Sequence, residues 1–432
     1  MIKKAQIFLY TFRHEFLIFL LLFFTLLCQL PDRLHDWNSA WYAMDYSLGF
    51  DSRLFIGSLL HIFYPDFLPA EAAYTFVFLS LILLLLMLSY VLGYALRQTE
   101  MTPAGQPFAK AGQPFAKIPF GKYSQAGKGL LLLIAFYLLC PGSPSYLWTS
   151  ENMGRFDAYL LLVTLAAIIC CFHISSPWLQ LIPITLAGLI ALSIHQAFLF
   201  LFFPLLFTLY MKAADGKRTS KAYIISAFAA MAVMGMAFLY FQFFSHIRIP
   251  SCEELVFLLS SRTDLPISEV ALNYEYFSTV AQSSSDLVLN LLGERIRYGL
   301  VTLFLLSPLA ALYLYVWFHI LKSAMKKEKW IYILLLLSHL CFVPAFLLTI
   351  DWGRWFGAFL TMQALQIVVL AAKKDVPVLS ALHSLDGAFR KHPYLFIAAG
   401  IWVGSLHKFQ ATLLPDAPVF FTSLYKLYRL IF

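Results

Sequence analysis

Long apolar segments recur along the whole chain, and charged residues lie almost entirely between them. Apolar residues make up 61% of the sequence and charged residues only 12%, whereas a soluble domain carries about 25% charged residues. A helix needs about 20 apolar residues to cross the hydrocarbon of a bilayer. We therefore predict an all-α fold: a polytopic transmembrane helical bundle forming a single membrane domain over residues 1–432. Hydropathy predicts about eleven spans, at residues 14–30, 74–96, 129–148, 158–175, 179–195, 197–211, 222–245, 297–320, 331–350, 355–372 and 394–407.

The connections between these segments fall into two chemically different sets. One set carries sixteen Lys and four Arg, and the other carries eight Arg and no Lys ahead of the C-terminal tail. Short cytoplasmic loops retain basic residues, so we expect the Lys-rich set and the N-terminus to face the inside of a bacterial cytoplasmic membrane. The net charge of +8 then reflects the excess of basic residues in the loops on the inner side of the lipid bilayer. The basic surface with interleaved aromatics that nucleic-acid binders show is missing, so no nucleic-acid partner is expected.

Several short motifs of known chemistry are absent from the sequence. The sequence contains no P-loop, no HExxH and no GxSxG, and the absence of a nucleotide-binding loop argues against an ATP-driven pump. Its six cysteines show no CxxC or Cys/His spacing, so neither disulfides nor a metal site is indicated. We expect no cofactor; a divalent cation is compatible with the chemistry considered below, but no residue pattern points to one.

The first extracytoplasmic loop, residues 31–73, is rich in aromatic residues. An apolar stripe at helical spacing predicts a helix that lies in the membrane interface and ends at Gly49. Asp51 and Ser52 are suited to cap a second helix that runs to about Tyr64. The stripe consists of Trp37, Ala40, Trp41, Met44 and Leu48.

Two further loops differ in character. Residues 98–128 contain a tandem copy of AGQPFAK at 104–110 and 111–117, which predicts a flexible cytoplasmic loop. Residues 246–296 form a long extracytoplasmic loop that is too polar to be buried, and we predict helices within it at 252–260 and 285–296.

Three aspartates in the first outer loop are candidates for a general base. Asp36, Asp45 and Asp51 lie close to Arg53 in the sequence. A carboxylate at an interface can accept a proton from a hydroxyl, while an arginine neutralises phosphate. The alternative is structural: Asp51 is a helix cap, and Asp36 and Asp45 lie on the solvated face of an interfacial helix.

The other candidates sit where apolar spans begin or end on the same side. Arg155 and Asp157 precede one span, His195 lies between two, and Asp351 and Arg354 flank a tight turn. Arginine grips phosphate with two parallel hydrogen bonds, so these residues are candidates for phosphate binding. The alternatives are ion pairs that fix helix ends and a structural histidine.

With its inner N-terminus, first span and acidic outer loop, the layout resembles the GT-C class of integral-membrane glycosyltransferases. The resemblance implies an enzyme that moves a sugar from a polyprenyl-phosphate donor to a glycan or lipid-linked acceptor on the extracytoplasmic face, with inversion. It implies a first-loop Asp as the base, and by position Asp45 is favoured over Asp36 and Asp51. The adjacent acid pair of some subfamilies is missing here. A polymerase of polysaccharide repeat units, or a transporter or flippase for a lipid-linked glycan, would use outer arginines in a similar way.

Overall fold

The computed structural model of the chain describes residues 10–100, 123–149, 152–214, 221–277, 292–326, 328–343, 346, 352–406 and 428–429. Within those residues the fold is built from helices, and no strand forms. Three isolated β-bridges connect loop residues. The predicted all-α class is confirmed.

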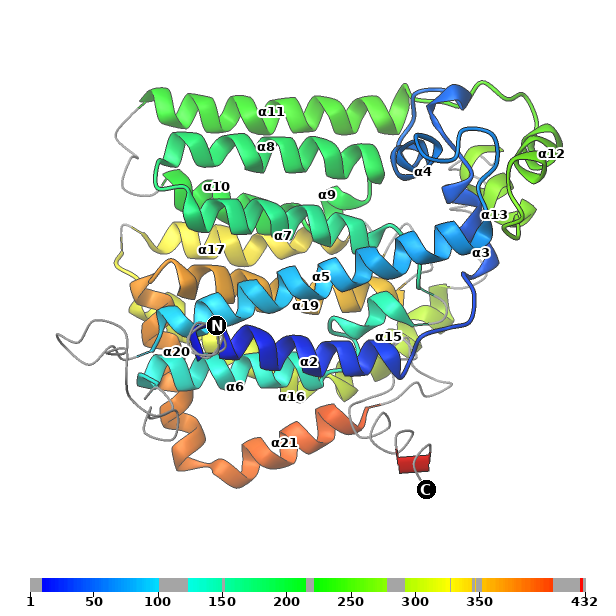
Figure 1. The fold of residues 1–432 in the computed structure, drawn as a ribbon. Coiled ribbons are helices and arrows are strands. Elements are labelled where there is room, and N and C mark those ends of the chain that lie inside the picture. Colours follow the sequence, from blue (N-terminus) through cyan, green and yellow to red (C-terminus); the bar gives the residue numbers. More distant parts are fainter. Residues whose placement is uncertain are drawn as a thin grey trace, which may run out of the picture.

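The longer helices lie side by side along a common direction (Figure 1). Helix α11 forms one edge of the bundle and α21 lies at the opposite edge, while α19 runs through the middle. The longer helices are α2 (Arg13–Leu27), α5 (Ala70–Gln98), α6 (Gln125–Leu139), α7 (Asp157–His173), α8 (Pro177–Ile194), α10 (Phe203–Ala214), α11 (Lys221–Phe243), α15 (Leu292–Leu305), α16 (Ser307–Ser323), α17 (Lys329–Leu337), α19 (Trp352–Ala372), α20 (Val376–Lys391) and α21 (Pro393–Ser405). The shorter ones are α3 (Asp36–Ser39), α4 (Leu54–His61), α9 (Phe198–Leu201), α12 (Cys252–Arg262) and α13 (Glu269–Leu272), with the single turns η1 (Ala40–Tyr42), η2 (Tyr46–Leu48), η4 (Ser145–Trp148), η5 (Asn273–Phe277) and η6 (Ser338–Cys341).

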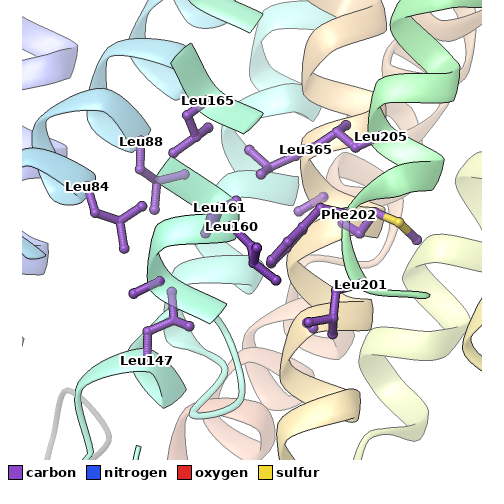
Figure 2. Packing of buried hydrophobic residues seen from close by; sticks show 14 of the residues in the cluster. Leu84, Leu88, Leu147, Leu160, Leu161, Leu165, Leu201, Phe202, Leu205 and Leu365 are labelled. Atoms are coloured by element: carbon purple, nitrogen blue, oxygen red, sulfur yellow. The ribbon is translucent and has the colours of Figure 1, made fainter. Parts of the chain in front are cut away.

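Helix α19 is the centre of the core. Nearly all its residues beyond Trp355 are buried, and Leu365 faces the leucines of α7 and the α9–α10 segment in Figure 2. Each of its two buried glutamines makes one side-chain hydrogen bond: Trp317 Nε1 donates to Gln363 Oε1 at 3.0 Å, and Gln366 Nε2 donates to Thr208. Gln366 Oε1 is buried and has no hydrogen-bond partner among the described residues. A helix that is apolar on all sides and buried among other helices is the central element of a bundle.

The number of long apolar helices is smaller than predicted. Four described helices are long and apolar enough to cross a membrane, and a fifth if Ile296–Leu305 and Ser307–Ser323, bent by 69°, count as one broken span. Several predicted spans form helices such as α6, which has 15 residues and is therefore about 22 Å long against about 30 Å of hydrocarbon. The four long helices are Ala70–Gln98, Pro177–Ile194, Ile225–Phe243 and Trp352–Ala372.

Turn-forming residues explain the shortfall. Hydropathy counts residues 140–148 as part of a span, but Pro141, Gly142 and Pro144 end α6 at Leu139 and leave only the turn η4. The predicted span 197–211 divides at Phe202 into α9 and α10.

The first outer loop also departs from prediction. Residues 36–48 form a short α3 and two single turns rather than one interfacial helix. The apolar stripe faces inward: Ala40 and Met44 are fully buried and Trp41 is 5% exposed. The second helix, α4, begins at Leu54 rather than beside Asp51. In the third loop, α12 confirms the helix predicted at 252–260; the repeat at 104–117 and residues 278–291 lie outside the described residues.

The described ends of the long helices fall at two opposite ends of the bundle (Figure 1). The short helices α3, α4, α12 and α13 gather at one end, which we call the arginine end because Arg53 directly precedes α4 and Arg262 ends α12. The last turns of α5, α10, α16 and α19 and the first turns of α6, α11, α17 and α20 lie at the other end. We call this the lysine end.

Candidate functional site

A short strap, residues 49–53, crosses the arginine end and is fixed on both sides. Gly49 has a φ of +148°, and a Cβ there would meet the carbonyl oxygen of His246 at 2.6 Å, so only glycine fits. The backbone N–H of Arg53 donates to the Ile194 carbonyl, 2.9 Å away. The strap is thereby held between the segment after α11 and the last turn of α8.

Arg53 takes a left-handed backbone conformation, with φ at +73°. For a residue with a side chain this costs about 1–2 kcal/mol, and such strain clusters at functional positions. Its guanidinium lies 5.2 Å from the ring centroid of Trp41, and its Nη2 lies 2.6 Å from Glu275 Oε1. The strained turn therefore aims a cation into a partly buried group of aromatic and acidic side chains.

Asp51 is the buried carboxylate of this group, with 8% of its surface exposed. Its Oδ1 accepts a hydrogen bond from Ser245 Oγ at 2.7 Å. Because α4 begins three residues later and has no side-chain cap, Asp51 does not serve as a helix cap. Burial raises the pKa of Asp51, although Ser245 and Arg53 act in the opposite direction. A raised pKa makes a carboxylate a better proton acceptor near neutral pH.

The π-helical turn η5 closes the group from the third loop. Burial raises the pKa of Glu275, against the attraction of Arg53. The ring of Tyr276 lies 6.0 Å from that of Trp41, and its buried hydroxyl has no hydrogen-bond partner among the described residues. Single π-helical turns are rare and occur frequently at functional sites.

A second ion pair joins the first turns of α7 and α19. Arg354 Nε lies 2.5 Å from Asp157 Oδ2, and Arg354 Nη2 lies 3.1 Å from Asp157 Oδ1. The side chains are 11% and 2% exposed, so this two-point contact is buried. Just before α7, the Tyr42 hydroxyl donates to the Gly154 carbonyl at 2.6 Å, which fixes the turn that carries Arg155.

His195 follows the last residue of α8 and is partly buried. Its Nδ1 accepts the backbone N–H of Ala197 at 3.0 Å, so the proton of the neutral ring is on Nε2. Burial, and then the charges of Arg53, Arg354 and Arg155, lower the pKa of His195 well below its usual value. His195 is therefore a neutral hydrogen-bond donor at physiological pH.

The two ion pairs lie close enough to act on the same titratable groups. After burial, the charges of all three arginines lower the pKa of His195. The pKa of Glu275 is raised by burial and by Asp51, and Arg53 and Arg354 act in the opposite direction. We define the arginine site as Asp51, Arg53, Arg155, Asp157, His195, Glu275, Tyr276 and Arg354. Six of the sequence-predicted candidates meet here, from four separate parts of the chain.

The remaining candidates lie elsewhere. Asp45 caps η2 by accepting the Ser47 N–H at 2.7 Å, and its Oδ2 lies 3.3 Å from Arg262 Nη1 and 3.8 Å from His61 Nδ1. Asp36 is exposed at the first residue of α3. None of these partners belongs to the arginine site. The role of Asp45 or Asp36 as the base stays a prediction. Asp351 lies outside the described residues.

Sequence reasoning did not single out several members of this region. Glu275 and Tyr276 lie in the loop 246–296, between the two helices predicted there, and an acid flanked by tyrosines in Asn-Tyr-Glu-Tyr-Phe was a usable signal. Nothing in the sequence around Ser245 indicated that it would contact Asp51. Tyr146, whose buried hydroxyl has no hydrogen-bond partner among the described residues, is influenced by the charges of Asp157 and Arg354.

The arginine site and its surroundings contain buried hydrogen-bond donors that have no partner among the described residues. Buried donors without partners call for an explanation, such as a ligand or water that satisfies them. The Tyr146 and Tyr276 hydroxyls and Arg53 Nε are such donors within the described residues. In the same part of the chain, no group of three His, Cys, Asp or Glu side chains is arranged to hold a metal ion.

Comparison of the chain with protein-family models, with characterised proteins and with solved structures finds no match. Any functional conclusion therefore depends on the chemistry of the arginine site and on the arrangement of the helices around it.

Proposed function

We propose that the protein is a membrane glycosyltransferase that moves a sugar from a polyprenyl-phosphate donor to a hydroxyl acceptor at the arginine site. The main support is the meeting of three arginines, a neutral histidine and a buried carboxylate from distant parts of the chain. A lipid-linked sugar phosphate needs cations for the phosphate, and its transfer needs a base for the acceptor.

The proposal includes membrane insertion. The long apolar helices supply at least four candidate spans, and the shorter apolar helices beside them complete a bundle of about eleven crossings if the bilayer thins around them. The lysine end then faces the cytoplasm by the loop-charge rule. The arginine site faces the extracytoplasmic side, where lipid-linked sugars would reach it from the membrane.

Each side chain has a distinct part in the proposed reaction. Arg53, Arg155 and Arg354 bind the donor phosphate and stabilise the charge that develops on it. His195 donates a hydrogen bond from Nε2 to a phosphate oxygen or a sugar hydroxyl. Asp51 accepts the acceptor's proton. We prefer it to Asp45 and Asp36 because Asp51 is buried, accepts a hydrogen bond from Ser245 and lies close to Arg53 in the strap.

The bond changes are those of an inverting displacement. The acceptor oxygen attacks the anomeric carbon and forms the new glycosidic bond. The bond between that carbon and the phosphate oxygen breaks, and its electron pair stays on the polyprenyl phosphate. The acceptor proton passes to Asp51. Positioning two substrates and a general base together can supply several orders of magnitude in rate.

Asp51→Asn tests the proposal in reconstituted vesicles. Undecaprenyl-phosphate-linked glucose, mannose and galactose serve as donor probes, and release of free undecaprenyl phosphate is measured with lipid-linked disaccharide and oligosaccharide acceptors. We expect release by the wild type and a loss of about 10²–10⁴-fold in Asp51→Asn. Asp36→Asn is the matched control, because it neutralises an exposed acid of the same loop.

The alternatives give different results. Full activity in Asp51→Asn would remove it as the base. Transfer of the labelled lipid between leaflets without any new glycosidic bond would identify a transporter. Lengthening of the acceptor by whole repeat units would identify a polymerase.

A further inference from the structure

A groove between α2 and α6 plays no part in the proposed transfer. It has a volume of about 470 Å³, within the range of about 300–1,000 Å³ typical of ligand pockets. Leucines line most of its length, among them Leu17 and Leu131, which are 57% and 41% exposed. The two helices run alongside one another in Figure 1. The groove is therefore an apolar channel on the side of the bundle, open to its surroundings.

The groove becomes polar where it reaches the lysine end. Arg13, His14 and Tyr123 line this part. Glu100 pairs with Arg13 and lies 2.7 Å from His14 Nε2, while the Tyr123 hydroxyl lies 3.0 Å from His14 Nδ1. Lys128 is exposed on α6, one turn before the lining residue Leu131, and so points along the same face of the helix.

Among the described residues beside the groove at this end, positive charge is in excess. Glu100 balances one of the two cations, Arg13 and Lys128. The neighbouring Glu15 and Arg97 pair with each other at 2.8 Å. Arg13 Nε is buried and has no hydrogen-bond partner among the described residues.

The described residues that line the far end of the groove carry no charge. Its lining there comes from the turn after α6, including Pro141, Ser143 and Ser145. A ligand that matches this profile has an anionic group at the lysine end and a hydrocarbon chain that extends toward the other end.

We propose that the groove binds one acyl chain of an anionic phospholipid, with the phosphate at Arg13 and Lys128. The inner leaflet carries anionic lipids that attract basic residues near the membrane surface, and the lysine end faces this leaflet in the orientation proposed above. The site depends on the proposed membrane insertion and orientation, but not on sugar transfer.

Lipid binding to the purified full-length protein tests this site. Native mass spectrometry measures the affinity for phosphatidylglycerol and for phosphatidylcholine with the same chains. We expect tighter binding of phosphatidylglycerol. Lys128→Gln removes an exposed charge and should weaken phosphatidylglycerol binding about fivefold.

Filling the groove is the second arm of the experiment. Ala135→Phe places a ring among the lining residues and should weaken binding about tenfold or more, because a chain that loses several buried methylenes loses most of its binding energy. Ala229→Phe, at an exposed position of α11, is the matched control and should bind as the wild type does.

Three results would overturn the proposal: equal affinity for phosphatidylcholine, wild-type affinity for phosphatidylglycerol in Ala135→Phe, or preference for undecaprenyl phosphate over phosphatidylglycerol. The test is independent of catalysis, because Asp51→Asn lies at the opposite end and should leave phosphatidylglycerol binding unchanged.

Discussion

The ion pair between Arg354 and Asp157 offers the sharpest test of how the arginine site is held together. Asp157→Asn removes one charge while keeping the shape of the side chain, and Arg354→Gln removes the other. The double variant removes both. The three variants together form a thermodynamic cycle that isolates the interaction between the two groups.

The structure sets the size of the effect. The contact is two-pointed, at 2.5 and 3.1 Å, and only 2% of the Asp157 side chain is exposed. Removing one partner of a buried pair costs about 3–5 kcal/mol, because the other charge is left without compensation. Removing both should cost less than the sum of the single changes, with a coupling energy of about 2 kcal/mol or more.

The assay is reversible unfolding of the purified protein in mixed micelles by titration with denaturant, which gives the free energy of unfolding of each variant. Arg248→Gln provides the control, since Arg248 is an exposed arginine. That change should alter the free energy of unfolding by no more than about 0.5 kcal/mol. The reasoning fails if Asp157→Asn costs as little as Arg248→Gln, or if the single effects simply add.

Three further predictions follow from the same structure. The rate of the proposed transfer should rise with pH as Asp51 ionises, with a midpoint above the usual carboxyl pKa of about 3.9. Ser245→Ala should move this midpoint to higher pH, because it removes a hydrogen bond that favours ionised Asp51. A midpoint near 3.9 would contradict this. The pKa of His195 is lowered in the folded protein. Its contribution to stability is therefore present above its unfolded pKa of about 6.5 and is lost as the pH falls through the pKa of the folded state. His195→Gln should lack this pH-dependent decrease in the free energy of unfolding between pH 7.5 and 5. Gly93→Ala should destabilise the protein by about 1–3 kcal/mol, since a Cβ would meet the Glu15 side chain at 2.6 Å and its backbone nitrogen at 2.8 Å; an unchanged unfolding midpoint would refute this packing.

Some of the site was accessible from sequence because it depends on local rules. Arg155, His195 and Arg354 each adjoin an apolar segment, and alternation of spans places such positions at the same end. The helical class followed from hydropathy, and the helix predicted at 252–260 corresponds to α12. These features depend on neighbours along the chain, which the sequence displays directly.

Other parts of the site depend on contacts between distant segments. The choice of Asp51 over Asp45 required the strap, which turns at Arg53 and meets Ser245 almost two hundred residues away. Similarly, the pairing of Arg354 with Asp157 joins two helices that no local pattern connects. The count of spans failed because hydropathy does not register the proline turns that end α6.

The two walls of the arginine site differ in how they are anchored. Arg354 lies in the first turn of α19, whose residues are almost all buried, whereas Glu275 lies on the single π-helical turn η5. An anionic ligand would compete with Glu275 for Arg53, while Arg354 would stay in place on α19. Ligand binding and release would then require displacement of η5. Substitutions in η5 that leave the free energy of unfolding unchanged should therefore alter the rate of the proposed transfer.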